Sequence, residues 1–226
     1  MKVKEKQANL FLPGVQAWRN ALSVNRFIFQ LVITLVYILL LVIFMGYYFI
    51  YLEARTGTVL TDWVLNLLPP KDFSVTIFGL LYPAIILGVI YVSAKPSLFL
   101  RVFQAAAIVY TARIFTLFIV KLNPPAGFIP LIDPFGELLG YGGKLVTKDL
   151  FFSGHVTSLT ILFLAVQKLW LKILLLTAVF IMAVLLLWQH VHYTIDILGG
   201  VFFSVIGWKI TENFSIPLPA NGNLHL

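Results

Sequence analysis

The chain has 226 residues, of which 60% are hydrophobic and only 11% are charged. A soluble domain carries about 25% charged residues, so this composition excludes a soluble fold and a disordered chain and predicts an integral membrane protein. The absence of cysteine excludes a disulfide scaffold, a zinc ribbon and a cysteine nucleophile. We assign the formal net charge of +7 to membrane-flanking loops and anionic lipid headgroups rather than to nucleic acid binding.

The chain starts with a basic segment of 26 residues, and an uncharged stretch, Phe27–Leu52, follows it. This stretch is too long for the hydrophobic region of a signal peptide, so it predicts the first transmembrane helix. Five further spans are expected at Phe73–Val92, Val102–Val120, Leu150–Gln167, Leu171–Gln189 and Val191–Trp208. The sequence therefore predicts an all-α integral membrane protein, a six-helix bundle over 27–211, with a basic N-terminal segment 1–26 and a C-terminal tail 212–226.

The distribution of lysine and arginine predicts how the bundle is oriented. With the N-terminus inside, the inner segments hold ten of these residues and the outer segments hold five. Because cytoplasmic loops carry the excess of positive charge, we expect both termini in the cytoplasm. The loops 53–72 and 121–149 and the tight turn near His190 then face the extracytoplasmic side. The second loop is long and irregular, with four prolines and five glycines in 122–149, which favours a functional role.

The fourth predicted span opens with polar residues on the extracytoplasmic side. Ser153 or Gly154 is expected as its N-cap, which places His155 in the first helical turn. The free N–H groups of a helix N-terminus bind phosphate, and a histidine there can donate a proton to a departing alkoxide. The alternative is a capping serine followed by an interfacial histidine without a catalytic role.

The sixth predicted span opens on the same side with a second polar cluster. His192 and Asp196 are four residues apart, so a helix would place them on one face within hydrogen-bond reach. A carboxylate on one ring nitrogen fixes the tautomer and leaves the other nitrogen free to attack. The alternative is a structural His–Asp pair that ties two helices together.

The motifs SGH at 153–155 and HYTID at 192–196 resemble the two signature motifs of the sphingomyelin synthase family, a branch of the type 2 phosphatidic acid phosphatase superfamily. The segment 113–125 (RIFTLFIVKLNPP) and, more weakly, 60–72 (LTDWVLNLLPPKD) are also similar to segments of that family. The resemblance covers about 60–210 in order. The related acid phosphatases carry an arginine seven residues before the second histidine, where this chain has Leu185, which favours the synthase branch.

The resemblance implies a phosphotransfer on lipids that needs no metal and no cofactor. By analogy, His192 attacks the phosphorus, Asp196 orients it, and His155 protonates the leaving alkoxide. The implied donor is phosphatidylcholine or phosphatidylethanolamine, the acceptor is a lipid alcohol such as ceramide, and diacylglycerol is released. With water as acceptor the enzyme would be a lipid phosphatase or a phospholipase C-type hydrolase.

Three further residues are assigned to the same site. Asp149 matches an acidic position ahead of the SGH motif and is expected to orient His155, and Glu137 is a looser candidate of that kind. Arg113 is expected to neutralise phosphate charge, with an ion pair to Asp196 as its alternative.

Two other readings remain at this stage. His155, His190, His192 and Asp196 together would suit a zinc hydrolase, although His190 and His192 would diverge on a helix. A lipid transporter or scramblase could use the same polar cluster without chemistry. The sequence leaves the oligomeric state open, including a homo-oligomer.

Overall fold

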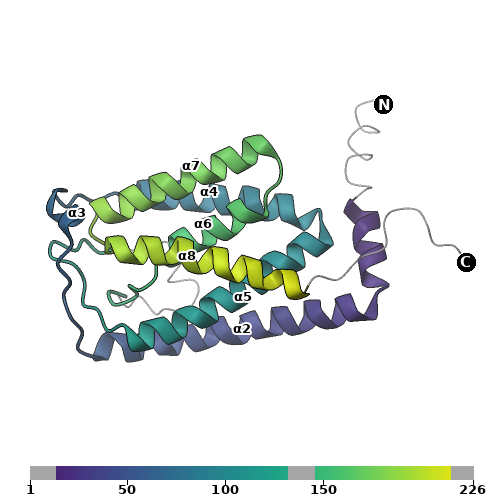
Figure 1. Ribbon diagram of the computed structural model, residues 1–226, viewed down its shortest axis with the longest axis horizontal. Helices are drawn as coiled ribbons and strands as arrows, with labels where there is room; N and C mark the ends of the chain where they lie inside the picture. Colours follow the sequence, from purple (N-terminus) through teal and green to yellow (C-terminus); the bar gives the residue numbers. More distant parts are fainter. Residues whose placement is uncertain (1–13, 132–145, 215–226) are drawn as a thin grey trace, which may run out of the picture.

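The computed structural model of the chain describes residues 14–131 and 146–214. Helices in these ranges run up and down a bundle, and no strand is formed within them (Figure 1). In chain order the elements are α2 (Asn25–Ala54), α3 (Trp63–Asn66), α4 (Ser74–Ser93), α5 (Pro96–Ile119), α6 (Gly154–Ala165), α7 (Leu169–Trp188), α8 (Thr194–Ile210) and the 3₁₀ helix η1 (Thr211–Phe214). Residues 14–22 form a further helical segment ahead of α2.

Five helical segments are long and apolar enough to cross a membrane: α2, α4, α5, α7 and the continuous stretch Thr194–Phe214. The prediction of an all-helical, multi-pass membrane protein is thus confirmed. The fourth predicted span, Leu150–Gln167, is the exception, because its helix α6 has only 12 residues. At 1.5 Å per residue α6 is about 18 Å long, less than the ~30 Å hydrocarbon core.

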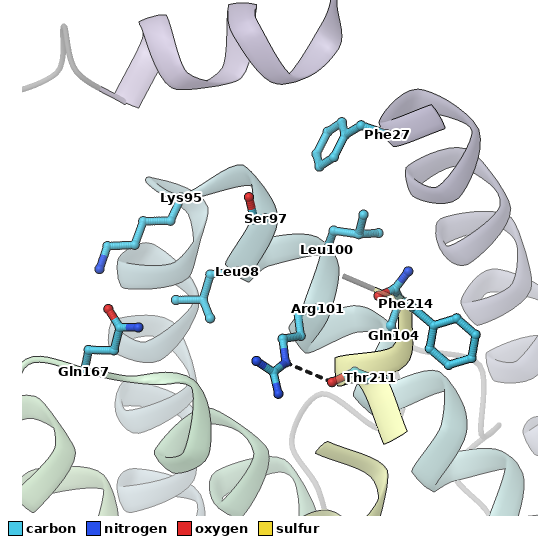
Figure 2. Close-up of a pocket in the computed structure, with 10 residues that line it drawn as sticks. All are labelled: Phe27, Lys95, Ser97, Leu98, Leu100, Arg101, Gln104, Gln167, Thr211 and Phe214. Carbon is cyan, nitrogen blue, oxygen red and sulfur yellow. Dashed lines mark hydrogen bonds between the residues drawn. The ribbon is translucent and has the colours of Figure 1, made fainter. Parts of the chain in front are cut away.

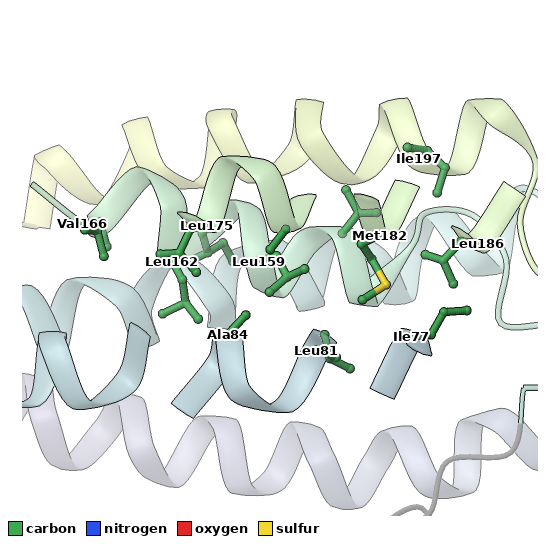
Figure 3. Close-up of a cluster of buried hydrophobic side chains, with 14 of the residues drawn as sticks. Ile77, Leu81, Ala84, Leu159, Leu162, Val166, Leu175, Met182, Leu186 and Ile197 are labelled. Atoms are coloured by element: carbon green, nitrogen blue, oxygen red, sulfur yellow. The ribbon is translucent and has the colours of Figure 1, made fainter. Parts of the chain in front are cut away.

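The central position of α6 explains how a short helix fits in this bundle. It packs against α4, α5, α7 and α8, and most of its side chains are buried. Its Leu159 and Leu162 lie among core side chains from α4, α7 and α8 (Figure 3). Irregular backbone at membrane depth is tolerated where protein surrounds it, so the non-helical residues that precede α6 need no contact with lipid.

The start of α5 also differs from the prediction. The predicted span began at Val102, whereas the helix begins at Pro96. Proline at the first position of a helix has the required φ, and it lacks only an N–H that would be unpaired there. The helix therefore starts at Pro96, five residues before Arg101. The long side chain of Arg101 reaches polar partners while its stem lies on the bundle.

The up-and-down path gives the bundle two distinct ends. One end carries α3 and the loops that join α2 to α4, α5 to α6 and α7 to α8, and we call it the histidine end (Figure 1). The other carries the α4–α5 and α6–α7 turns, the helical segment 14–22 and η1, and we call it the basic end. The two loops that the sequence placed on one side, 53–72 and 121–149, meet at the histidine end through a bridge between Thr58 and Leu122.

Candidate active site

The first histidine motif forms the N-terminus of α6, as its sequence predicts. Ser153 occupies the N-cap position and His155 lies in the first turn. The Ser153 side chain makes no capping hydrogen bond, and its buried Oγ has no partner among the described residues. A buried polar atom without a partner is rare in folded proteins and is typical of a site that receives a ligand.

The second histidine motif has the predicted contact but not the predicted helical geometry. His192 precedes α8, so it does not stack with Asp196 along a helix. Instead Asp196, in the first turn of α8, reaches back, and its Oδ2 lies 3.2 Å from His192 Nδ1 and 2.9 Å from the backbone N of Tyr193. The residues are 2% and 0% exposed. Because Asp196 accepts at Nδ1, Nε2 is the nitrogen left for chemistry.

The two motifs lie against each other. The backbone N–H of Ser153 donates to the carbonyl oxygen of Asp196 at 3.0 Å, and the rings of His155 and His192 are 6.4 Å apart between centroids. Gly200 allows this close packing, since a Cβ there would lie 3.0 Å from the Ser153 carbonyl oxygen. A helix-to-helix approach through glycine therefore brings both histidines to one place.

Arg113 lies beside the first motif, inside the bundle. It is 3% exposed and stands six residues before the end of α5, about 9 Å inward along the helix axis. Its Nε donates to the carbonyl oxygen of Phe152 at 2.6 Å, and a Cβ on Gly154 would lie 3.4 Å from its guanidinium carbon. The site is thus recessed from the loops, with one guanidinium at the N-terminus of α6.

The ion-pair partner of Arg113 is Asp149, not Asp196. Arg113 Nη2 lies 2.6 Å from Asp149 Oδ1, so the alternative pairing with Asp196 was wrong. Asp149 therefore supports the guanidinium of Arg113, and its expected effect on His155 stays a prediction. Glu53 fastens the preceding segment by accepting from Lys148 N at 2.7 Å and Thr147 Oγ1 at 2.8 Å. Glu137 lies outside the described residues.

Asp62 is a residue of this region that sequence reasoning missed. Its carboxylate accepts from Thr194 N at 2.6 Å and Thr194 Oγ1 at 3.0 Å, and it also caps α3 through Val64 N at 3.0 Å. It therefore fixes the start of α8, two residues after His192. The one sequence signal was the segment 60–72, whose resemblance to the family was weak.

Tyr193, between His192 and α8, holds the same segment from another side. It is 1% exposed, and its hydroxyl donates to the Asn123 carbonyl at 2.9 Å and accepts from Leu60 N at 3.2 Å. Burial, together with the negative charges of Asp196 and Asp62, raises the pKa of Tyr193 above its ordinary value. The hydroxyl therefore remains protonated at neutral pH and donates throughout.

His190 does not join the other two histidines. Its Nδ1 lies 2.6 Å from the Ala126 carbonyl oxygen and its Nε2 lies 2.9 Å from that of Leu68, so the ring ties two loops together. Over residues 14–131 and 146–214, no group of three His, Cys, Asp or Glu residues is arranged to hold a metal ion. The zinc hydrolase reading, which used His190, therefore lacks its ligand set in this part of the chain.

Comparison with known families bears on the same segment. Residues 148–213 match the family model described as PAP2 superfamily C-terminal. This match supports the type 2 phosphatidic acid phosphatase superfamily. It spans both histidine motifs and suggests lipid phosphatase or phosphotransferase activity, without selecting the sphingomyelin synthase branch. No curated protein matches the chain.

Proposed function

We propose that this protein is a membrane-embedded lipid phosphotransferase that moves a phosphoalcohol headgroup from a glycerophospholipid to a lipid alcohol. The observation that carries the proposal is the pairing of His192 Nδ1 with buried Asp196, which leaves Nε2 for attack, while the His155 ring lies 6.4 Å from the His192 ring between centroids. Arg113 and the N-terminus of α6 add positive potential at the same place. These are the parts that a two-step transfer through a phosphohistidine requires.

In the first step, Nε2 of His192 attacks the phosphorus of phosphatidylcholine or phosphatidylethanolamine. The bond between phosphorus and the diacylglycerol oxygen breaks, and that oxygen takes a proton from His155, so diacylglycerol leaves. The headgroup phosphate stays on His192. Asp196 stabilises the positive charge that develops on the ring, in the way a triad carboxylate does.

In the second step, His155 accepts the proton of an acceptor hydroxyl, and the acceptor oxygen attacks the phosphorus. The bond between phosphorus and Nε2 breaks, which restores His192. Ceramide as acceptor gives a sphingolipid and completes a transfer. Water as acceptor gives the hydrolase alternative at the same site.

The charge balance of the site supports a phosphodiester substrate. Arg113 is already paired with Asp149 at 2.6 Å, and Asp196 adds a second carboxylate close by. A phosphodiester carries one negative charge, whereas a monoester carries close to two at neutral pH. A site with this balance compensates the diester more completely, which favours headgroup transfer over phosphatidate hydrolysis.

Purified protein in detergent with EDTA tests the proposal. It is incubated with phosphatidylcholine or phosphatidylethanolamine, with and without ceramide, and the products are separated by lipid mass spectrometry. Transfer predicts diacylglycerol plus a new ceramide phospholipid, both absent in His192→Ala. Lys209→Gln is the control, because Lys209 is exposed at the other end of the bundle.

Other products would separate the alternatives. Diacylglycerol with a water-soluble headgroup phosphate identifies a phospholipase C-type hydrolase, and turnover of phosphatidate alone identifies a lipid phosphatase. No turnover of any of these lipids, with lipid movement between leaflets that His192→Ala leaves intact, would replace the enzyme by a scramblase. Loss of activity on EDTA treatment would contradict a metal-independent step.

We further propose that the histidine end faces the extracytoplasmic side and that both termini are cytoplasmic. The basic end carries most of the described cations, which supports this orientation. The chain has no cysteine, so single cysteines can report sidedness without background. In intact cells a membrane-impermeant maleimide should label Lys71→Cys but not Lys168→Cys, and the reverse pattern would contradict the orientation.

A further inference from the structure

The basic end contains a cavity of about 360 Å³ between the starts of α2 and α5, the α6–α7 turn and η1. It lies at the opposite end of the bundle from the two histidines, so it is separate from the candidate active site. Its polar lining includes Lys95, Ser97, Arg101, Gln104 and Gln167, and Figure 2 shows Lys95 and Gln167 on one side of Leu98 and Arg101 on the other. The volume is near the lower end of small-molecule sites, enough for a headgroup but not for a whole lipid.

The two cations of the cavity retain hydrogen-bond donors. Lys95 Nζ donates to Tyr91 Oη at 2.8 Å, which uses one of its three protons. Arg101 donates from Nε to Thr211 Oγ1 at 2.9 Å and from Nη2 to Glu212 Oε1 at 3.1 Å and the Trp208 carbonyl oxygen at 3.3 Å, while its Nη1 has no hydrogen bond to the described residues. Its guanidinium is held 4.1 Å from the centre of the Trp208 ring. Protein contacts therefore hold the side chains of Lys95 and Arg101 in position, and both still have donors that can bind an anion.

The backbone between them adds two more donors. Lys95 and Arg101 flank the first turn of α5, where Pro96 has no N–H. The N–H groups of Ser97 and Leu98 have no helix carbonyl to bond, since a first turn leaves them unpaired. Two cations and the first turn of α5 thus line one cavity, and together they supply the kind of donors that phosphate oxygens accept.

The position of the cavity at the membrane edge favours a lipid over a soluble anion. Trp170 and Trp208 lie at this end of the bundle, and tryptophan is enriched at the headgroup level. Apolar side chains complete the lining, among them half-buried Leu98 and Phe214, which is 45% exposed. A phosphate on a glycerol backbone would meet cations with its charged part and these side chains with its apolar part.

We propose that this cavity binds the phosphate headgroup of an anionic phospholipid from the leaflet at the basic end. Glu212, whose side chain is 64% exposed, pairs with Arg101 and competes with the lipid for that guanidinium. A surface pair of this kind contributes little energy, so a lipid phosphate can replace it. The inference does not depend on the proposed phosphotransfer.

Native mass spectrometry of the full-length protein in detergent tests the proposal, with titrations of dioctanoyl phosphatidylglycerol, dioctanoyl phosphatidylcholine and inorganic phosphate. The anionic lipid should bind more tightly than the neutral lipid. Lys95→Gln and Arg101→Gln should each weaken its binding by about fivefold, as expected for one cation at an anionic headgroup. Glu212→Gln should strengthen it, because a competing carboxylate is removed.

The control is Lys209→Gln, which removes the same charge from the same end but does not line the cavity. An equal loss in Lys209→Gln would mean general attraction to a basic surface and overturn the proposal. Inorganic phosphate binding as tightly as the lipid would also overturn it in favour of a soluble anion. If the preference for the anionic lipid is lost in His192→Ala but remains in Lys95→Gln, the lipid binds at the histidine end instead, and the proposal is overturned. If Arg101→Gln disturbs the fold, the binding of the anionic lipid to Lys95→Gln decides the test, and unchanged binding there would overturn the proposal.

Discussion

The two ends of the bundle use charged residues in opposite ways. Among the residues that the structure describes, five acidic side chains lie at the histidine end, and each accepts a hydrogen bond or forms an ion pair: Glu53, Asp62, Asp72, Asp149 and Asp196. The basic end, within the described ranges, has one acidic residue, Glu212, and seven cations, Arg19, Arg26, Lys95, Arg101, Lys168, Lys172 and Lys209. Charged residues are therefore held by specific protein partners at one end and form an excess of positive charge at the other.

Solvation explains the difference. A charge that is withdrawn from water is costly unless a partner replaces its hydration, so Arg113 and Asp196 are each bonded to specific atoms. A lysine at the headgroup level keeps its hydration and is attracted by anionic lipid without a protein partner. Substitutions at the histidine end should therefore alter activity and stability, while most substitutions at the basic end should alter neither.

Asp196→Asn should have the largest effect. An amide can still accept from Tyr193 N, but it supplies no negative charge for His192 and can hold the wrong ring tautomer. Turnover of phospholipid should fall about 10³- to 10⁴-fold, as for a triad carboxylate. The measurement is headgroup release per mole of folded protein, with thermal unfolding as the check on folding. A fall of less than tenfold would reduce the His192–Asp196 contact to a structural pair.

Arg113→Gln should have the next largest effect. It leaves Asp149 without its ion-pair partner and the Phe152 carbonyl without its donor. We expect a loss of about 2 kcal/mol in the free energy of unfolding, below the value for fully buried pairs because the Asp149 side chain is 30% exposed. Denaturant titration measures this loss, and turnover should fall as well.

The double variant Arg113→Gln/Asp149→Asn separates stability from catalysis. It removes the uncompensated carboxylate, so it should regain part of the stability. Turnover should stay low, because the guanidinium is still missing beside α6. Recovery of turnover together with stability would show that Arg113 acts on the fold and not on phosphate.

Asp62→Ala should have an intermediate effect. It removes the acceptor for the backbone and hydroxyl of Thr194, two residues after His192. Leaving these donors unpaired costs about 1–3 kcal/mol, and the displaced segment should lower kcat more than it raises KM. Turnover kinetics with lipid concentration varied provide the two parameters.

Asp72→Ala is the matched control in the same loop. Within the described ranges Asp72 bonds only locally, accepting from Ser74 N at 2.8 Å and Ser74 Oγ at 2.6 Å at the start of α4. Its loss should lower stability, because the Asx turn that precedes α4 loses its hydrogen bonds, and leave kcat unchanged. Equal losses of kcat in both variants would mean that Asp62 does not position His192.

Much of the fold could be predicted from composition and hydropathy. Uncharged stretches longer than 17 residues define spans, and the helices α2, α4 and α7 begin and end within about two residues of the predicted limits. The length of α6 could not be predicted, because hydropathy does not distinguish lipid from a protein interior around an apolar segment. The early start of α5 follows from Pro96, a local signal that the charge of Arg101 obscured.

The site was predictable within each histidine motif, and the shared side of the fourth and sixth spans also predicted that the two motifs lie near each other. The four-residue spacing of His192 and Asp196 predicted their contact, although not its geometry, since His192 precedes α8, and the motif SGH predicted the N-terminus of α6. The Arg113–Asp149 pair joins helix α5 to the loop before α6, which hydropathy treats independently, so the alternative partner of Arg113, Asp196, was wrong. Asp62 and Thr194 are 132 positions apart, and no periodic pattern links such residues.

Lys168→Gln should have the smallest effect of all. Lys168 is the N-cap of α7, where a positive charge opposes the helix dipole, so its removal should gain about 0.3–0.5 kcal/mol. The same change removes a cation–π contact, 5.4 Å from the Trp170 ring, worth about 0.5–1 kcal/mol at an exposed site. The two terms nearly cancel, so the free energy of unfolding should change by less than about 0.5 kcal/mol and turnover by less than about twofold. Thermal unfolding and headgroup release measure both, and a tenfold loss of turnover would show that the basic end acts on the histidine end through the bundle.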